Sequence, residues 1–502
     1  MPRKTADLAF LGNDKDGIVN LSLKKEELHV LKFNTSELRK TFEQKVDLDA
    51  TKNFNSEEVT DFKNGNYYWM HSDWEKDTET EMLYYDKIDV SSGRMTDINH
   101  KMFQTTKAAG NMVSNGFYSA RTTNKYTFTY DAAHTRLLVS YRLFPEFRSD
   151  KKNYDVLGFQ VFDESMKKIW GGEFRMPYTE AVMDNSNFSV DGKGNAYLLA
   201  NVYDDDSRRE KDKSTGLPGY HYEVMKFTKD SKKMLIVPID LKENFINESS
   251  LVENSSNEMI VACTYGTKAK SNGTDGIFLA TINQQGKLVN YMNGYYQFPK
   301  EELLKYESAR MRRKIEKNDD NPVANLKVRD VLVDSDGSIF ISCEEYFKRV
   351  VTTYISGVIT TNTYYYYNDI LTSKIDASGK FAWMCKIPKR QRGINTGGKG
   401  TMSYKLVSDA SGYYFLYLDN IKNMKLADNE EPKAHIDGMG GQVIVSKITK
   451  DGVSSKELLF DTRDEDIMIF PSYFSKINNN QFIGRARVKR NLFQPLLITL
   501  NR

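Results

Sequence analysis

Residues that could perform chemistry are few in this chain and lie far apart along it. No two histidines have the spacing of metal ligands, and none belongs to a His-Glu-x-x-His pattern, which would place two imidazoles on one helix face. Three cysteines are too few for a disulfide scaffold; Cys263 and Cys343 occupy matching places in strand-like runs, so we expect them to be buried. The full set is His29, His71, His100, His134, His221, His435, Cys263, Cys343 and Cys385. This pattern predicts neither a metal site nor a reactive thiol.

Two further segments resemble ligand-binding loops without completing the pattern. Gly393 to Lys399 has the spacing of a phosphate loop, but Gly400 stands where Ser or Thr must hold magnesium, and a strand-like run follows instead of a helix. Asp334-Ser-Asp-Gly337 resembles the start of a calcium loop but lacks the distal carboxylate. The Gly-x-Ser-x-Gly pattern of a nucleophile elbow is absent. We therefore expect no cofactor, no metal and a non-catalytic protein.

Composition narrows the choice of partners. The 502 residues contain 71 Lys+Arg and 68 Asp+Glu, a formal net charge of +3, with 39% hydrophobic and 28% charged residues. Binding of phosphate backbones needs a surplus of cations, so nucleic acid is not the expected partner. No apolar run of about 18 residues occurs, so no transmembrane segment is expected. The start, Met1 to Asp7, is not a secretory signal, because no apolar segment follows its basic residues; either the protein is cytoplasmic or a leader has been removed.

The chain is an internal repeat of strand-like runs and turns. One half of the unit is a turn with Asp, Asn or Gly followed by an apolar strand, as in Asp191 to Ala200, Asp334 to Ser342 and Asp409 to Tyr417. The other half is an alternating strand, a hairpin turn and a further strand, as in Leu157 to Trp170 and Leu371 to Trp383. A unit recurring along a whole chain is the sign of a repeat architecture.

We count eight copies and predict an all-β fold, a β-propeller of eight four-stranded antiparallel blades forming one domain over residues 1–502. Seven blades with one irregular copy is the alternative count, and two tandem β-sandwiches are the alternative fold. The last copy offers only three strands, so we expect that it either stays three-stranded or takes a strand from residues upstream of Met1. The copies lie near residues 1–50, 55–105, 126–178, 185–240, 247–295, 326–390, 402–462 and 468–502, and their second strands begin near 18, 66, 136, 195, 259, 338, 413 and 481.

The copies are longer than a minimal four-stranded blade of about 40–45 residues, and the additional residues are unevenly placed. The long stretches all fall between second and third strands or between successive copies, and in a four-stranded meander both kinds of connection emerge on the same side of the disc. We therefore expect one smooth face and one face with long insertions, which is where binding tends to occur; neutral drift of loop length is the alternative. The insertions are 144–153, 204–219, 267–274, 295–325, 345–368 and 420–440.

Three insertions carry candidate contact residues. Residues 350–355 and 359–367 flank Ser356-Gly-Val358 and predict a projecting hairpin with an aromatic surface typical of interfaces, unless the tyrosines pack on a neighbouring loop. Residues 299–317 have helical character, and their cations either grip an acidic partner or form a solvated face. The mixed-sign loop 204–213 is expected to be solvated. The candidate partner-binding residues are Tyr346, Tyr354, Tyr364, Tyr365, Tyr366, Tyr367, Arg310, Arg312, Arg313 and His435.

Four segments resemble a group of uncharacterised exported proteins of Bacteroidota. They are Tyr365 to Ile370, Trp383 to Lys389, Phe415 to Asn420 and His435 to Gly441, within the C-terminal third. The resemblance implies a periplasmic or cell-envelope location. In such bacteria a large propeller could serve an outer-membrane secretion or transport complex, such as the type 9 secretion system.

The leading hypothesis is a non-catalytic scaffold that binds a protein partner through the face with the long insertions. The alternative is an envelope hydrolase or lyase at the mouth of the central channel, with His435 and Asp437 as candidates. A carbohydrate-binding module that uses exposed tyrosines is the third hypothesis.

Overall fold

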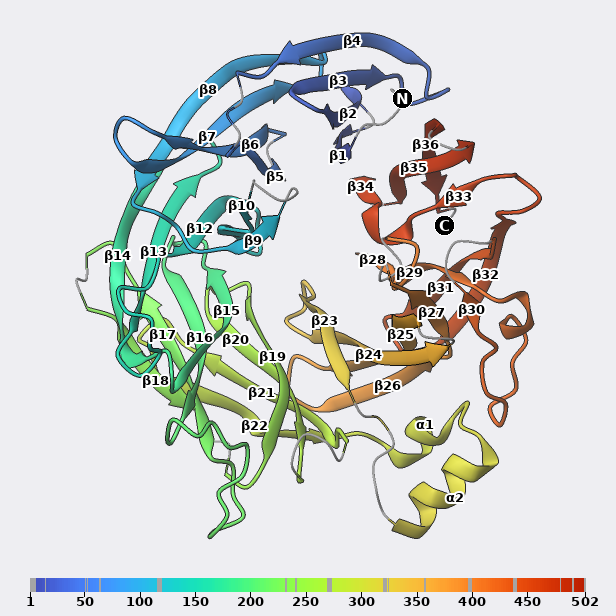
Figure 1. Ribbon diagram of the computed structural model, residues 1–502. Helices are drawn as coiled ribbons and strands as arrows, with labels where there is room; N and C mark the ends of the chain where they lie inside the picture. Colours follow the sequence, from blue (N-terminus) through green and yellow to red (C-terminus); the bar gives the residue numbers. More distant parts are fainter. Residues whose placement is uncertain are drawn as a thin grey trace.

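The computed structural model describes residues 6–13, 15–49, 51, 53–62, 65–114, 120–230, 233–239, 242–268, 273–318, 323, 325–355, 358–395, 400–436, 440–478, 480–489 and 492–500. In the described chain, eight sheets of four or more strands follow one another around a common centre (Figure 1), and a ninth sheet has only two strands. This is the predicted propeller with eight blades. The tandem-sandwich alternative is not observed.

The first five sheets are four-stranded meanders in which each strand pairs with the next along the chain. Their strands are β1 (Ala6–Asn13), β2 (Gly17–Lys24), β3 (Glu27–Phe33) and β4 (Lys40–Asp47); β5 (Asn55–Asp61), β6 (Tyr67–Glu75), β7 (Thr80–Asp89) and β8 (Arg94–Thr105); β11 (Tyr126–Tyr130), β12 (Arg136–Arg142), β13 (Tyr154–Asp163) and β14 (Lys168–Thr179); β15 (Met183–Val190), β16 (Ala196–Tyr203), β17 (Tyr220–Phe227) and β18 (Leu235–Ile239); and β19 (Phe245–Glu253), β20 (Met259–Gly266), β21 (Gly276–Ile282) and β22 (Leu288–Gln297).

The seventh sheet is again a four-stranded meander, whereas the sixth and the eighth depart from this plan. The sixth has two strands beyond the expected four: β27 pairs with β25, and β30 pairs with β27 in parallel. In the eighth, β33 and β34 both pair with β35, as two pieces of one inner strand, and β36 pairs with its other side. The strands are β23 (Leu326–Val333), β24 (Ile339–Ile355), β25 (Val358–Ile375), β26 (Phe381–Ile387), β27 (Gln391–Ile394) and β30 (His435–Ile436); β28 (Lys405–Asp409), β29 (Gly412–Asp419), β31 (Gln442–Thr449) and β32 (Ser454–Asp461); and β33 (Met468–Ile469), β34 (Ser475–Asn478), β35 (Gln481–Lys489) and β36 (Leu492–Thr499).

The core lies between neighbouring sheets, which explains the apolar runs in the sequence. Every residue of β20, β21 and β29 is buried, because each of these strands is covered on both faces. One cluster joins Leu199 and Val224 of the fourth blade to Val261 and Phe278 of the fifth. The same arrangement joins the ends of the chain, since Phe10 of β1 belongs to one buried cluster with Ile477 and Ile483 of the eighth sheet. The first and last sheets are therefore in contact.

Polar contacts on the short-turn side tie blades together. The Glu253 carboxylate accepts the N–H of Ala132 in the third blade (2.8 Å) and the N–H of Gly192 in the fourth (2.7 Å). Trp170 donates its indole N–H to the carbonyl of Gly194 in the next blade (2.6 Å), and Trp383 does the same to Lys450 (3.0 Å). The repeated Asp turns thus serve both their own hairpin and the neighbouring blade.

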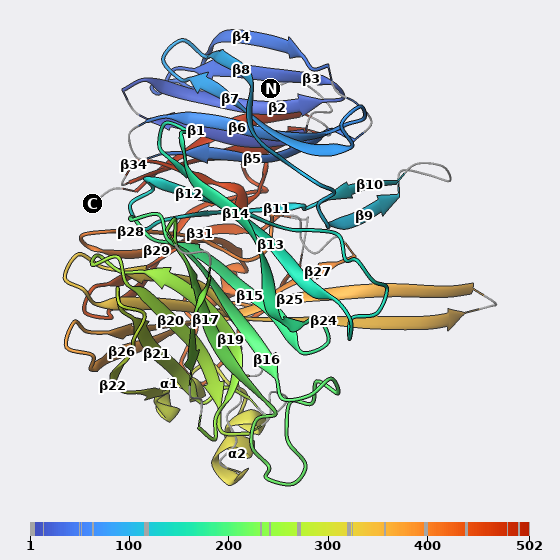
Figure 2. The same ribbon diagram turned by 90° about the vertical axis from the view of Figure 1, so that its left-hand side faces the viewer.

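The two faces differ as predicted. Every described turn between first and second or third and fourth strands is short, whereas the connections on the other side carry a hairpin of β9 (Asn111–Ser114) and β10 (Ala120–Thr123), the helices α1 (Lys300–Leu304) and α2 (Ala309–Asn318), and the paired extension of β24 and β25. Figure 2 shows β9, β10 and the ends of β24 and β25 projecting from the same side of the ring. Neither helix in the described part of the chain is long and apolar enough to cross a membrane.

Candidate functional site

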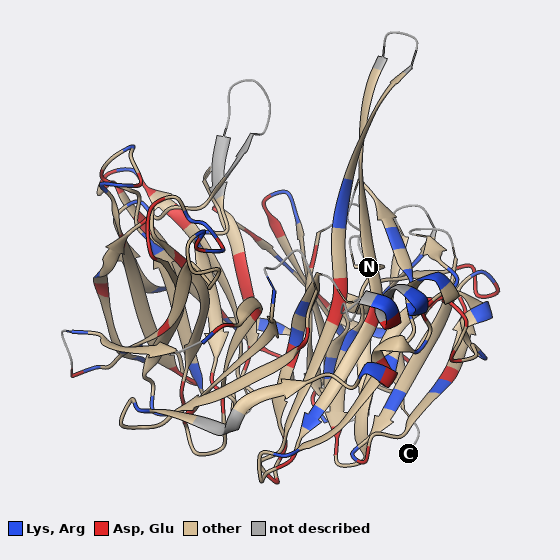
Figure 3. Ribbon diagram, turned by 90° about the horizontal axis from the view of Figure 1, so that it is seen from below, with Lys and Arg blue, Asp and Glu red and all other residues tan. Residues whose placement is uncertain are grey.

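The most prominent feature of the face with the insertions is the two-stranded extension of blade six. Beyond the sheet, β24 and β25 continue as an antiparallel pair up to the partners Ile355 and Val358. Figure 3 shows this pair rising well clear of the rest of the molecule. We call residues 346–355 and 358–367 the ribbon. The predicted hairpin is therefore confirmed; Ser356 and Gly357 at its turn lie outside the described residues.

One face of the ribbon carries three large exposed apolar side chains. Tyr354 lies directly across from Ile359, and Val350 lies four residues before Tyr354 on the same strand. Because cross-strand partners and alternate residues share a face, all three point to the same side. Their exposed fractions are 60% for Val350, 73% for Tyr354 and 68% for Ile359. We call these three residues the ribbon patch.

The edge of β24 that pairs with β23 within the sheet is open along the ribbon. The N–H of Tyr346 donates to the carbonyl of Asn325 (3.1 Å), but after this point no described strand pairs with that edge. The other strand, β25, is covered at its base, where Tyr364 to Tyr367 pair with β27. An open edge presents unpaired N–H and C=O groups, which can accept a strand from another chain.

The base of the ribbon is held by aromatic contacts. The rings of Phe347 and Tyr366 stack at 4.5 Å, and those of Tyr346 and Tyr367 lie 4.9 Å apart. The guanidinium of Arg392 lies 5.9 Å from the Tyr364 ring. All these tyrosines are half-buried. They brace the ribbon and leave its patch free.

A buried charge network lies beneath these rings. The Lys389 ammonium is 2.7 Å from the Glu344 carboxylate, and neither side chain is exposed. The Lys386 ammonium lies 2.8 Å from Glu307 and 3.2 Å from Asp369. Burial raises the pKa of Glu345 to about 7, and the Asp369 carboxylate adds to that increase. Paired buried charges of this kind fix one arrangement, because separating any pair leaves a charge without solvent.

Three insertions that are distant in sequence meet at this base. The Tyr306 N–H, between α1 and α2, donates to the carbonyl of Asp428 (2.6 Å), and the Arg312 guanidinium donates to the same carbonyl. A pocket of about 190 Å³ remains between the segments, lined by Tyr306, Glu307, Glu345, Phe347, Tyr366, Asn368, Asp369, Lys389, Arg390, Glu431 and Pro432. The insertions thus form one assembly around the ribbon.

The predicted site residues fall into different environments. Tyr354 is at the exposed end of the ribbon, whereas Tyr346, Tyr364, Tyr365, Tyr366 and Tyr367 are half-buried near its base. Arg310 and Arg313 are exposed on α2, and Arg312 is partly buried against the insertion that contains Asp428. His435 is 5% exposed and lies in β30 within the sixth sheet, so it does not contribute to the exposed surface; Asp437 lies outside the described residues.

Val350 and Ile359 were not predicted as partner-binding residues, because they are aliphatic residues in a segment dominated by tyrosines. The alternation of side chains along the two strands of the predicted hairpin could have placed both residues on the same face as Tyr354. The remaining histidines are spread over blades one to four, and no group of three His, Cys, Asp or Glu in the described chain has metal-site geometry.

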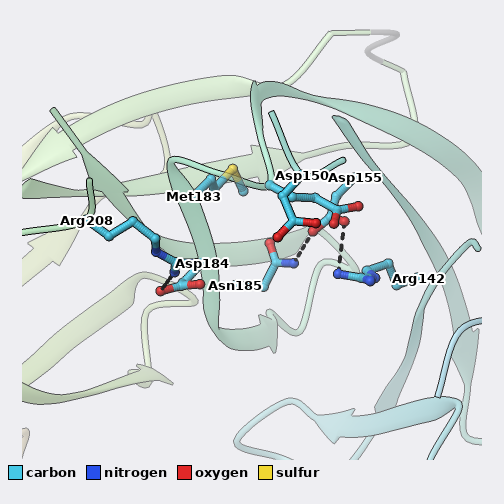
Figure 4. A pocket seen from close by; sticks show the side chains of 8 residues that line it. Arg142, Asp150, Asp155, Met183, Asp184, Asn185 and Arg208 are labelled. Carbon is cyan, nitrogen blue, oxygen red and sulfur yellow. Dashed lines mark hydrogen bonds and ion pairs between the residues drawn. The ribbon is translucent and has the colours of Figure 1, made fainter. Parts of the chain in front are cut away.

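A second pocket on the same side lies between blades three and four (Figure 4). Its volume is about 420 Å³. The Asp155 carboxylate accepts from Asn185 (2.8 Å) and lies 3.2 Å from Arg142, while Arg208 pairs with Asp184. The last pair attaches the 204–219 insertion to the start of β15. The pair of Arg208 and Asp184 thus holds the insertion at this pocket, which Asp150 and Glu180 also line.

The strand order defines this protein as a β-propeller with one elaborated face. No family model and no curated protein matches the chain. Among solved structures it is similar to the polysaccharide lyase Uly1, with 10% identity over 89% of this chain and 90% of that one, at a TM-score of 0.39.

Two further solved structures show the same level of similarity. Prolyl oligopeptidase B from Galerina marginata has 8% identity over 98% of this chain and 54% of its own, at a TM-score of 0.40, so the present chain spans about half its length. A protein of unknown function from Dyadobacter fermentans DSM 18053 has 11% identity over 81% of this chain and 94% of its own, at a TM-score of 0.32. Similarity at this level says nothing of activity.

Proposed function

We propose that this protein is a non-catalytic binding propeller that engages a protein partner through the ribbon. The observation that carries the proposal is the ribbon patch: Val350, Tyr354 and Ile359 share one face and are mostly exposed to solvent. When a partner covers apolar side chains on a projecting element, their surface is removed from water. This makes the free energy of binding more favourable by about 25 cal/mol for each Å² that is buried. Aromatic and aliphatic anchors of this kind supply most of the energy of typical interfaces.

The open edge of β24 indicates how the partner binds. An extended segment added to an exposed sheet edge forms main-chain hydrogen bonds for affinity and places alternate side chains over the sheet face for specificity. Here the unpaired edge of β24 and the ribbon patch lie on the same element. The proposed partner therefore contributes an extended, apolar-polar alternating segment.

The base of the ribbon is held in place by contacts within the protein, and this lowers the entropy cost of binding. Stacked rings and the buried pair of Lys389 and Glu344 hold the ribbon in position before binding. A preorganised element loses less conformational freedom on association than a mobile loop does.

On the resemblance to exported Bacteroidota proteins, we further propose that the partner is an envelope protein, within an outer-membrane secretion or transport complex. Fractionation of native cells with antibody detection tests the location: recovery in the periplasmic or membrane fraction supports it, and recovery with cytoplasmic markers contradicts it.

The test of binding compares two forms of the protein in the native host. In the shortened form an Asn-Gly turn replaces residues 350–363 and joins Arg349 to its cross-strand partner Tyr364, so the pairing with β27 is kept. Affinity purification with quantitative mass spectrometry should recover a partner with the intact protein and lose it with the shortened form. A matched control carries Val351→Thr, a single change on the opposite face of the ribbon. Equal recovery with the intact and shortened forms would contradict the proposal.

A further inference from the structure

A pocket of about 930 Å³ lies between blades one and two, on the same side as the insertions. The connection from β4 to β5 forms one wall, and the ends of β6 and β7 form the other. This pocket is separate from the ribbon, which belongs to blade six. Nothing in the proposed function uses it.

Five carboxylates line the pocket, against one lysine. Among the described residues, Asp47, Asp49, Asp73 and Glu75 make no ion pair with Lys or Arg, and Lys76 makes none with a carboxylate. The fifth, Asp86, is buried and lies 3.4 Å from His71. By contrast, Asp155 in the pocket between blades three and four lies 3.2 Å from Arg142. The pocket therefore holds an uncompensated negative charge.

A second observation comes from His71 at the bottom of the pocket. Its side chain is 6% exposed, and it lines this pocket. Its Nε2 is 3.4 Å from the Asp86 carboxylate, which can only accept, so Nε2–H donates; in the neutral imidazole Nδ1 is then the acceptor. Nδ1 makes no hydrogen bond with any described residue. His71 thus brings to the lining of this pocket a ring nitrogen for which no hydrogen bond to a described residue is found.

Aromatic rings complete the lining. The Tyr84 ring stacks on His71 with centroids 5.5 Å apart, and the Phe54 ring lies 5.4 Å from His71 on another side. Burial raises the pKa of Tyr84, and the neighbouring Glu75 and Asp73 carboxylates raise it further, which places these acids beside the ring. Ring faces attract cations and pack against alkyl chains.

We propose that this pocket binds an organic cation, a primary ammonium or guanidinium group on an apolar arm. Its polar lining consists largely of acceptors, and such a cation is a donor without acceptors. The ring faces suit the arm. The same chemistry is offered by a free alkyl amine and by an Arg side chain of a protein, so the test must separate these two sources.

Isothermal titration calorimetry of the full chain at about 0.15 M salt, where long-range attraction is screened, provides the test. The probes are agmatine, a short neutral peptide with one central Arg, and 1,5-pentanediol as the uncharged control. We expect saturable one-site binding of agmatine or of the Arg peptide and none of the diol. Binding of the peptide alone would assign the site to a protein side chain, and binding of agmatine alone to a small molecule.

Two double variants keep the test independent of folding. Asp49 is exposed and Glu75 partly exposed, so D49N/E75Q removes two pocket charges without touching the core and should weaken binding about tenfold. D464N/E465Q removes the same charges from an exposed connection in another part of the ring and should leave the affinity unchanged. Binding of neither cation, equal binding of the diol, or equal weakening by both double variants would overturn the proposal.

Discussion

The Lys389 ammonium and the Glu344 carboxylate lie 2.7 Å apart in the base of the ribbon, and neither is exposed to solvent. Lys389 also donates to the carbonyl of Tyr367 (3.0 Å) and to the amide oxygen of Gln391 (3.2 Å). This one ammonium therefore joins β24, β25 and β27. It therefore helps to hold the base of the ribbon in position.

Replacing Lys389 by Met should destabilise the protein by about 3–5 kcal/mol, because Glu344 is left buried with one cation fewer. Urea unfolding followed by tryptophan fluorescence measures the loss. The double variant E344L/K389M should regain part of it, since the buried carboxylate is then gone too, while Arg329, 2.8 Å from Glu344, loses its partner. A single variant within about 0.5 kcal/mol of the parent would show that the pair has no such role.

Stability should depend on pH through Glu345. Its pKa is about 7 in the folded protein, chiefly through burial and then through Asp369, against about 4.3 in an unfolded chain. The folded state therefore holds a proton that the unfolded state has lost, and the contribution of Glu345 falls as the pH rises from about 4.3 to about 7.

The measurement for Glu345 is the free energy of unfolding at several pH values for the parent and for E345Q. The parent should lose about 1–3 kcal/mol relative to E345Q between the two ends of this window. Comparison with E345Q removes the effect of Asp419, whose pKa burial raises to about 6. Parallel curves for the two proteins would refute the assignment.

The three thiols should be inert in the native protein. Cys263, Cys343 and Cys385 are free and buried, and burial raises all three pKa values, that of Cys385 to about 11. Ellman's reagent near neutral pH should find no fast-reacting thiol in the native state and three in guanidinium chloride, because the thiolate is the reactive form. One thiol titrating rapidly under native conditions would be inconsistent with this structure.

Much of the fold could be predicted because the repeat encodes its own turns. Asp191 accepts the N–H groups of Lys193 and Asn195 (3.1 and 2.8 Å), and Gly194 takes a φ of 82°, which favours glycine. Such local signals placed the second strands: β2, β6 and β12 begin at residues 17, 67 and 136, against predicted starts near 18, 66 and 136. The buried Cys263 and Cys343 followed from the same alignment of strands.

Features set by distant contacts could not be predicted in this way. Strands β27 and β30 pair across connections from different blades, and their short sequences carry no strand pattern of their own. The tyrosine run predicted an interface, yet Tyr366 and Tyr367 pack on Phe347 and Tyr346 because the register places them opposite those rings. The pocket beside His71 arises from a contact between two blades.

The central claim is that Val350, Tyr354 and Ile359 form the contact surface for a protein partner. Its most direct test is the affinity of the co-purified partner for a triple variant with Thr at these three positions, measured by surface plasmon resonance beside V351T on the opposite face of the ribbon. Threonine keeps the strand preference and removes the apolar surface. We predict a loss of about 100-fold or more for the triple variant and less than about twofold for V351T. Equal affinities of the triple variant and the parent would contradict the claim.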